Sequence, residues 1–67
     1  MEKIEADLYF ERVDLTHWKV YVNEVNDNSY WLICAKNMKE AIKRFKSFSV
    51  YKSNISRTYW VMPKEAR

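Results

Sequence analysis

The chain has 67 residues, a net charge of +3, one cysteine and no glycine. A chain this short forms one small domain, here residues 1–67, and buries only about 60% of the surface that its unfolded form exposes. A single cysteine excludes an intramolecular disulfide, and Cys34 with His17 falls short of the four ligands of a structural zinc site. Without glycine, neither a phosphate-binding loop nor a nucleophile elbow can be written. We therefore predict no metal, no cofactor and no enzyme.

Residues 3–11 alternate apolar and polar side chains, which is the period of a strand with one buried face. The apolar positions are Ile4, Ala6, Leu8 and Phe10. Ile4 and Leu8 also have a helical spacing, so a helix is the alternative here. Residues 14–16 follow as a turn.

A β-hairpin is predicted over residues 17–35. Residues 17–24 alternate like a half-buried strand, and residues 29–35 are a nearly continuous apolar run. Between them, residues 26–28 read Asn-Asp-Asn, and both residue types tolerate left-handed dihedrals and bond their own backbone. We expect the turn at these three residues.

A helix is predicted to follow Asn37. Asn37 is a good N-cap residue, and Glu40 stands three residues later, as in a capping box. The apolar stripe has the i, i+3, i+4, i+7 spacing of one helical face, and it consists of Met38, Ala41, Ile42 and Phe45.

The last predicted strand covers residues 57–62 and ends before Pro63, which cannot donate to a ladder. Residues 47–56 are read as the helix end and a connection. The fold class is then α+β, an antiparallel sheet of three to four strands with one amphipathic helix on one face, in the order β-β-β-α-β. The place of the last strand in the sheet does not follow from the sequence.

Charge divides the chain into two halves. Residues 1–35 hold three cations and seven acids, for a net charge of −4, whereas residues 36–57 hold seven cations and one acid, for +6. Such asymmetry is typical of a chain with an electrostatic partner. The alternative is that the two halves only attract each other on folding.

Catalytic chemistry finds little support in the sequence. We expect Cys34, within an apolar strand, to behave as a small buried hydrophobe, and His17 to be an ordinary surface or hairpin histidine. The acids of residues 2–14 are read as a solvated face. A chain of this length rarely encloses a substrate pocket of about 300 Å³ or more.

The sheet should have a covered face and an open face. The predicted core face carries Ile4, Leu8, Phe10, Trp18, Val20, Val22, Leu32 and Trp60. The predicted open face carries aromatic and cationic side chains, namely Tyr9, Lys19, Tyr21, Trp31, Arg57 and Tyr59. Such a face suits a protein partner or a single-stranded nucleic acid, and cross-strand aromatic pairing alone is the third interpretation.

The partner-binding residues that we predict come from the helix and from the open face of the sheet. They are Lys36, Lys39, Lys43, Arg44, Lys46, Lys19, Tyr21, Trp31, Arg57 and Tyr59.

Two resemblances bear on function. The spacing W-x-V-x-V at residues 18–22, a polar turn, a second strand, the helix start A-x-N-x-x-E-A at residues 35–41 and a final strand resemble small phage-encoded sheet-plus-helix proteins, among them the inhibitor of host RNA polymerase. This resemblance implies a phage or mobile-element regulator that binds and inhibits a host protein. Three strands followed by a helix, with Trp18 early in a strand, also resemble the arm-binding domain of tyrosine recombinases. That resemblance implies that the sheet reads DNA through Trp18, Lys19 and Tyr21.

Membrane insertion is not expected, because no apolar run approaches the roughly 18 residues of a membrane span, and no signal peptide is evident. A lone thiol fits the reducing cytoplasm. The expected partner is a host protein, with nucleic acid as the alternative. A homodimer with paired strand edges would also help so small a core.

Overall fold

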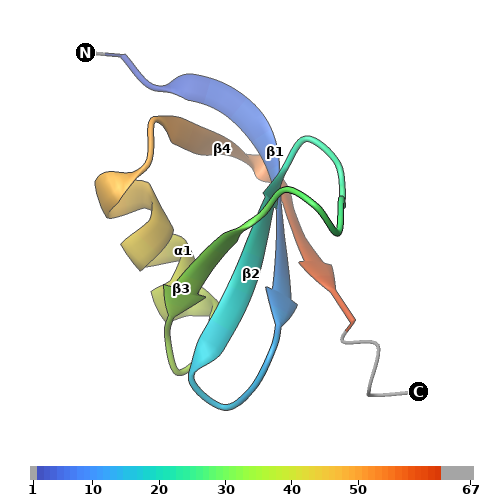
Figure 1. Ribbon diagram of the computed structural model, residues 1–67. Helices are drawn as coiled ribbons and strands as arrows, with labels where there is room; N and C mark the ends of the chain where they lie inside the picture. The colour runs from blue at the N-terminus through green and yellow to red at the C-terminus, as the bar shows by residue number, and fades with distance from the viewer. Residues whose placement is uncertain (1, 63–67) are drawn as a thin grey trace.

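The computed structural model describes residues 2–62, with only the main chain described for residues 54–57. One sheet has the strand order β3-β2-β1-β4, and a single helix, α1, lies on one face of it (Figure 1). The elements in chain order are β1 (Ile4–Arg12), β2 (His17–Val22), β3 (Trp31–Cys34), α1 (Met38–Phe48) and β4 (Tyr51–Val61). The α+β class and the predicted order of elements are confirmed, and residues 3–11 form a strand rather than a helix.

The sheet is mixed, which corrects the expectation of an antiparallel sheet throughout. β2 pairs antiparallel with both β1 and β3, whereas β4 pairs parallel with β1. The reason is the route of the chain. β3 runs in the direction of β1, α1 then carries the chain back along one face, and β4 must start at the end where β1 starts. Parallel strands need such a crossover connection.

The helix forms as its sequence predicts. The Asn37 side chain accepts a hydrogen bond of 2.9 Å from the backbone N–H of Glu40, which satisfies one of the orphan donors at the helix start. Ala41 and Phe45 are fully buried, and Met38 and Ile42 pack against the same core. The stripe therefore faces the sheet, and the cations between its members face solvent.

The fourth strand begins at Tyr51 and not at residue 57. Of the helix end and connection predicted over residues 47–56, the helix end is confirmed, since α1 ends at Phe48, and the connection from Tyr51 on is wrong. Two hydrogen bonds stabilise the short turn between α1 and β4. The Ser49 N–H donates to the Phe45 carbonyl at 3.0 Å, and the Tyr51 N–H donates to the Ser49 Oγ at 2.9 Å. The predicted role of Pro63 lies outside the described residues.

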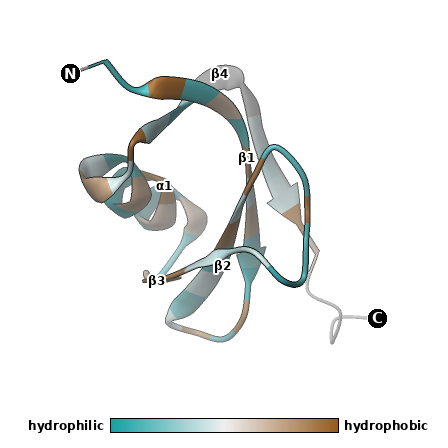
Figure 2. Cartoon of the chain, turned by 45° about the horizontal axis from the view of Figure 1, so that its top comes forward, coloured by the Kyte–Doolittle hydropathy of each residue, from teal (hydrophilic) through white to brown (hydrophobic). Residues whose placement is uncertain are grey.

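The hairpin between β2 and β3 has a longer loop than predicted, over residues 23–30. Asn23 adopts a left-handed conformation with φ of 69°, which Asn tolerates better than most residues, and it ends β2 early. The predicted turn is present, because the Asn28 N–H donates to the Asn26 side chain at 2.9 Å. Figure 2 shows that this loop is mostly hydrophilic.

The core lies between α1 and the middle of the sheet. Its fully covered residues include Leu8, Phe10, Val20, Ala41 and Phe45. Most of the predicted core face is confirmed.

Three predicted core residues, Ile4, Leu32 and Trp60, are exposed. Ile4 stands at the start of β1 and Trp60 on the edge strand β4, and a helix of 11 residues is only about 16 Å long. Leu32 pairs with Lys19 and points to the face opposite α1, so its predicted face was wrong. The helix cannot cover the whole width of four strands, so the margins of the sheet remain open.

Candidate functional site

The solvent side of α1 is the most cationic surface of the described residues. Its five cations, here called the basic helix face, are Lys36, Lys39, Lys43, Arg44 and Lys46, and all but the half-buried Lys46 are exposed. Arg44 makes an ion pair of 3.1 Å with Glu40, one turn earlier. The five predicted helix residues therefore do share one surface.

Folding alone accounts for only part of this surface. Lys46 lies in the last helical turn, where a cation stabilises the helix dipole. Lys36 precedes the N-cap and Lys39 is in the first turn, where a positive charge costs about 0.3–1 kcal/mol instead. The two lysines at the helix start thus oppose helix stability, which favours a role outside folding.

Tyr21 lies on the sheet face opposite α1, as predicted, but it is only 1% exposed. Its hydroxyl donates a hydrogen bond of 2.7 Å to Oε1 of Glu11, a carboxylate that is itself buried. Burial, and then this hydrogen bond, raise the pKa of Tyr21 above the usual value of a phenol. Tyr21 is a closed internal contact and is not available to a partner.

The other aromatic side chains of this face are also engaged. The rings of Tyr9 and Tyr59 stack with centroids 4.7 Å apart, and the Lys19 ammonium lies 4.7 Å from the ring centroid of Tyr30. Partial burial and the neighbouring Asp7 raise the pKa of Tyr9. Cross-strand pairing, the third interpretation of this face, accounts for these contacts and leaves few rings free to stack on bases.

Trp31 does not lie on the open face, which corrects its predicted position. Its neighbour across the β2–β3 ladder is Val20, a core residue, so Trp31 points to the side of α1. There its ring meets Phe45 and Phe48 edge-on, with centroids 6.3 and 6.1 Å away. Since Tyr30 and Trp31 are adjacent bulky residues, a shift by one residue exchanges their faces, and the sequence did not decide between them.

Phe48 is a surface residue that sequence reasoning did not single out. It is 54% exposed although it lies next to Trp31, which is 47% exposed. Together with Tyr30 and Leu32, both exposed, these side chains form an apolar margin around β3, here called the apolar edge. The helical spacing of Phe48 from Phe45, three residues, could have indicated that it lies near the stripe but at its border.

A hollow of about 490 Å³ opens beside the apolar edge. Its wall comes from the end of β2, the loop over residues 23–30 and the first residues of β3 and β4. The lining residues are Val22, Glu24, Asn26, Asn28, Ser29, Tyr30, Trp31 and Tyr51. Aromatic rings and neutral amides dominate this wall, and Glu24 is its one carboxylate.

The Asp14, Thr16 and His17 side chains meet at the start of β2. Nδ1 of His17 lies 2.9 Å from Asp14 Oδ1 and 3.1 Å from the Thr16 hydroxyl. In a catalytic triad the acid and the nucleophile contact different nitrogens of the histidine ring. Here Asp14 and Thr16 both contact Nδ1, so the three residues do not form a triad. The backbone N–H of Thr16, followed by His17, lowers the pKa of Asp14.

Cys34 is exposed, which corrects its predicted burial. It lies opposite His17 in the ladder between β2 and β3, on the side of the edge strand that α1 does not cover. Within residues 2–62, no group of three or more His, Cys, Asp or Glu side chains is arranged to hold a metal ion.

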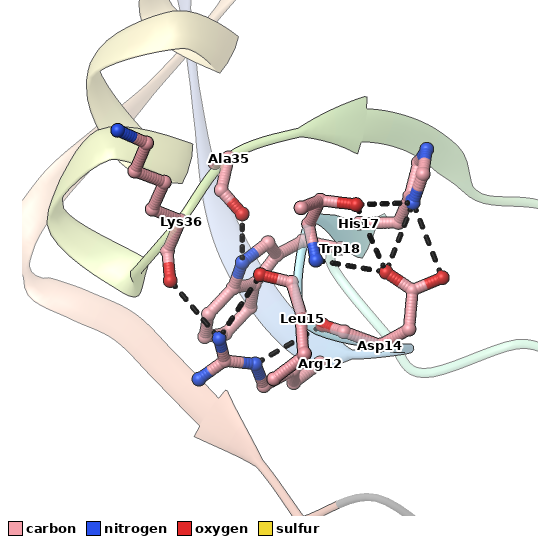
Figure 3. Close-up of polar contacts among 8 residues, drawn as sticks. Arg12, Asp14, Leu15, His17, Trp18, Ala35 and Lys36 are labelled. Carbon is pink, nitrogen blue, oxygen red and sulfur yellow. Dashed lines mark hydrogen bonds and ion pairs between the residues drawn. The ribbon is translucent and has the colours of Figure 1, made fainter.

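Arg12 fastens the end of the molecule where β1, β2 and β3 meet the helix start (Figure 3). Its Nε donates to the carbonyl of Asp14 at 3.1 Å, and one terminal nitrogen donates to the carbonyls of Leu15 at 3.2 Å and Lys36 at 3.0 Å. The guanidinium also lies 5.4 Å from the ring centroid of Trp18. We call this set the arginine clamp, and its geometry makes it structural.

The ten predicted binding residues therefore fall on separate surfaces. The helix cations lie on one side of the sheet, Lys19, Tyr21 and Tyr59 lie on the other, and Trp31 is at the edge. The side chain of Arg57 lies outside the described residues. Among the described residues, no helix has the length and hydrophobicity of a membrane span. No known family model, curated protein or solved structure matches this chain.

Proposed function

We propose that this protein is a non-catalytic binding protein that holds an acidic surface of another protein against the basic helix face. The observation that carries the proposal is the pair Lys36 and Lys39. Both are exposed and both stand at the positive end of the helix dipole, where folding is better served without them. A partner with carboxylates at its surface offsets that cost and gains a complementary field.

The biological setting in this proposal follows from the sequence resemblance. We place the protein among phage or mobile-element regulators that bind and inhibit a host protein, and we place its action in the cytoplasm. The exposed free thiol of Cys34 fits a reducing compartment. Inhibition in this proposal means occupancy of the host protein's surface by the basic helix face.

The test is a pull-down from nuclease-treated host lysate with the tagged protein, followed by mass spectrometry. A triple variant with Lys36→Glu, Lys39→Glu and Lys43→Glu should lose the partner that the wild type retains. Lys52→Glu, an exposed cation on β4, is the control and should retain it. Equal recovery by the triple variant and the wild type would overturn the proposal.

A nucleic-acid partner is the second candidate, because exposed lysines on one side of a helix also suit phosphates. The sheet face gives it less support, since Tyr21 is closed and Lys19 is held against Tyr30. A mobility shift on duplex and single-stranded DNA at two salt concentrations separates the two candidates. Phosphate contacts predict a log–log slope of about −0.9 per phosphate on duplex DNA, whereas no binding at low salt removes this candidate.

A further inference from the structure

β3 is an edge strand with a free main-chain row. The Ala35 N–H donates to the Thr16 carbonyl at 2.8 Å, toward β2. Because alternate residues of an antiparallel strand turn their polar groups to opposite sides, those of Leu32 and Cys34 point away from β2. No strand of the described sheet lies beside them, since β3 ends the strand order.

The two edges of the sheet differ in how they are protected. Natural edge strands carry charges, prolines or bulges that discourage further pairing. β4 carries the exposed Lys52, and its register with β1 shifts between Ala6 and Leu8. β3 reads Trp-Leu-Ile-Cys, with a regular register and no charge. Its side chains also leave the apolar edge exposed on both faces of the sheet.

We propose that a second copy of this chain pairs antiparallel with β3, so that two four-stranded sheets continue as one. With the two-fold axis at Ile33, the free polar groups of Leu32 face those of Cys34 in the partner copy. Trp31 then lies opposite the small Ala35 of the other copy. The free main-chain row on each copy is satisfied by the other copy.

The charges flanking β3 are self-complementary in this arrangement. The loop before β3 carries Glu24 and Asp27 and no cation, whereas Lys36 and Lys39 follow the strand. Glu24 shares the wall of the hollow with Trp31, so it stands near the start of β3. Antiparallel pairing brings the acidic end of one strand to the basic end of the other, twice, and parallel pairing would bring like charges together.

The area available is close to what a specific dimer needs. An aromatic ring buries about 150–250 Å² when fully covered, and Tyr30, Trp31 and Phe48 are each about half exposed. With Leu32 and the strand main chain, both copies together would bury roughly 1,000 Å², the lower limit of a specific interface. A small domain with a modest core gains stability from such an interface.

This dimer forms without the proposed protein partner, although Lys36 and Lys39 belong to both surfaces. It leaves α1 of both copies on the same face of the continuous sheet. Two basic helix faces would then stand side by side for one partner. A pull-down that recovers no partner would leave the proposal of a dimer standing. A protein that proves to be a monomer could still bind the partner through its one helix.

Sedimentation equilibrium over about a hundredfold range of concentration tests the inference, because mass action makes a dimer concentration-dependent. The wild type should approach twice its 8.2 kDa chain mass. Leu32→Lys places a charge on the edge at a side chain that is already 59% exposed, so the fold should persist, and dissociation should become at least tenfold easier. Met62→Lys is the matched control, because Met62 is 61% exposed, follows β4 at the opposite edge of the sheet and should leave dimerisation unchanged.

A charge exchange tests the orientation. Glu24→Lys should weaken the dimer, and Glu24→Lys combined with Lys36→Glu and Lys39→Glu should restore it. A wild type that stays at 8.2 kDa throughout, or a dimer that Leu32→Lys does not weaken, would overturn the proposal. Near-ultraviolet circular dichroism of each variant confirms that the fold is intact.

Discussion

The two ends of the sheet differ in their chemistry. At one end, Arg12 fastens three carbonyl groups and covers Trp18, whose indole N–H donates to the Ala35 carbonyl at 3.1 Å. At the other end, Trp31 and Phe48 meet edge-on and remain about half exposed, and Trp31 lines a hollow of about 490 Å³. One end is closed by directed polar contacts and the other is left apolar and open.

This difference separates structure from interaction. The clamped end satisfies its polar groups internally, so it has little to offer a partner. The open end leaves aromatic side chains in water, and residues of this kind dominate the centres of protein interfaces. We infer that stability should depend on the clamped end and the core, and association on the open end. Substitutions at the two ends and in the core test that division.

The largest contrast is expected between Phe45→Ala and Phe48→Ala, two identical changes one helical turn apart. Phe45 is fully buried, and its loss leaves a cavity, so we expect a decrease of about 3–5 kcal/mol in the free energy of unfolding. Phe48 is 54% exposed, so we expect less than about 1 kcal/mol from the monomer. Urea unfolding at one dilute protein concentration measures both.

The matched design separates packing from helix propensity, since the same residue type changes to alanine in the same helix. If Phe45→Ala is too unstable to fold, Phe45→Leu keeps the ranking with a smaller loss. Equal losses at the two positions would show that the open end is part of the core, and the division would be wrong.

Arg12→Met should give the second largest effect. Methionine keeps much of the apolar stem but leaves the carbonyls of Asp14, Leu15 and Lys36 without their donor, which should cost about 2–3 kcal/mol. Arg44→Met is the control, because it breaks only an exposed pair with Glu40 on one helix, for about 0.3–0.5 kcal/mol. Thermal unfolding compares the two, and a loss at Arg12 no larger than that at Arg44 would contradict the clamp.

The sequence predicted the local parts of this design and missed the parts that depend on distant segments. The helix cap at Asn37 and the stripe through Phe45 are set by neighbours in the chain, and both are confirmed. Arg12 gave no signal, because its acceptors are main-chain carbonyls, and one of them follows β3. The start of β4 at Tyr51 and its parallel pairing with β1 likewise depend on the path of the whole chain.

The sheet faces on which the β3 side chains lie were predicted wrongly for a different reason. Residues 29–35 are almost uniformly apolar, so no alternation decided between Trp31 and Leu32, and the prediction placed each on the wrong side. Such a run usually marks a strand buried on both faces. Here it marks an edge strand with apolar side chains on both faces, which is why Cys34 is exposed as well.

Tyr21→Phe tests a buried polar contact on the sheet face opposite α1. The change removes the hydroxyl donor to Glu11 and leaves a buried carboxylate oxygen without it, so we expect a loss of about 1–2 kcal/mol at neutral pH. Tyr59→Phe, at an exposed ring on the same face, should be nearly neutral. Denaturant midpoints of the two variants give the comparison.

The same substitution should change how the free energy of unfolding depends on pH above pH 10. The folded pKa of Tyr21 is raised above the value of about 10 in the unfolded chain. Its contribution is therefore fully present below pH 10 and is lost as the pH rises above that value, because the unfolded state releases the proton first. Tyr21→Phe should show a shallower fall in stability above pH 10 than the wild type, and parallel falls would contradict the assignment.

Asp14→Asn should give the smallest effect and the most specific one, since it removes charge at the clamped end while keeping an oxygen for the Thr16 N–H. The folded pKa of Asp14 is lowered below its usual 3.8, by that N–H and then by His17. Its contribution is therefore present above this value and is lost as the pH falls through the folded pKa. The wild type should exceed the variant in thermal midpoint at pH 7, and the difference should shrink toward pH 3. Glu2→Gln, at an exposed carboxylate remote from this network in sequence, should show no such pH-dependent difference, and an equal response from both variants would assign the effect to net charge instead of to the contacts of Asp14.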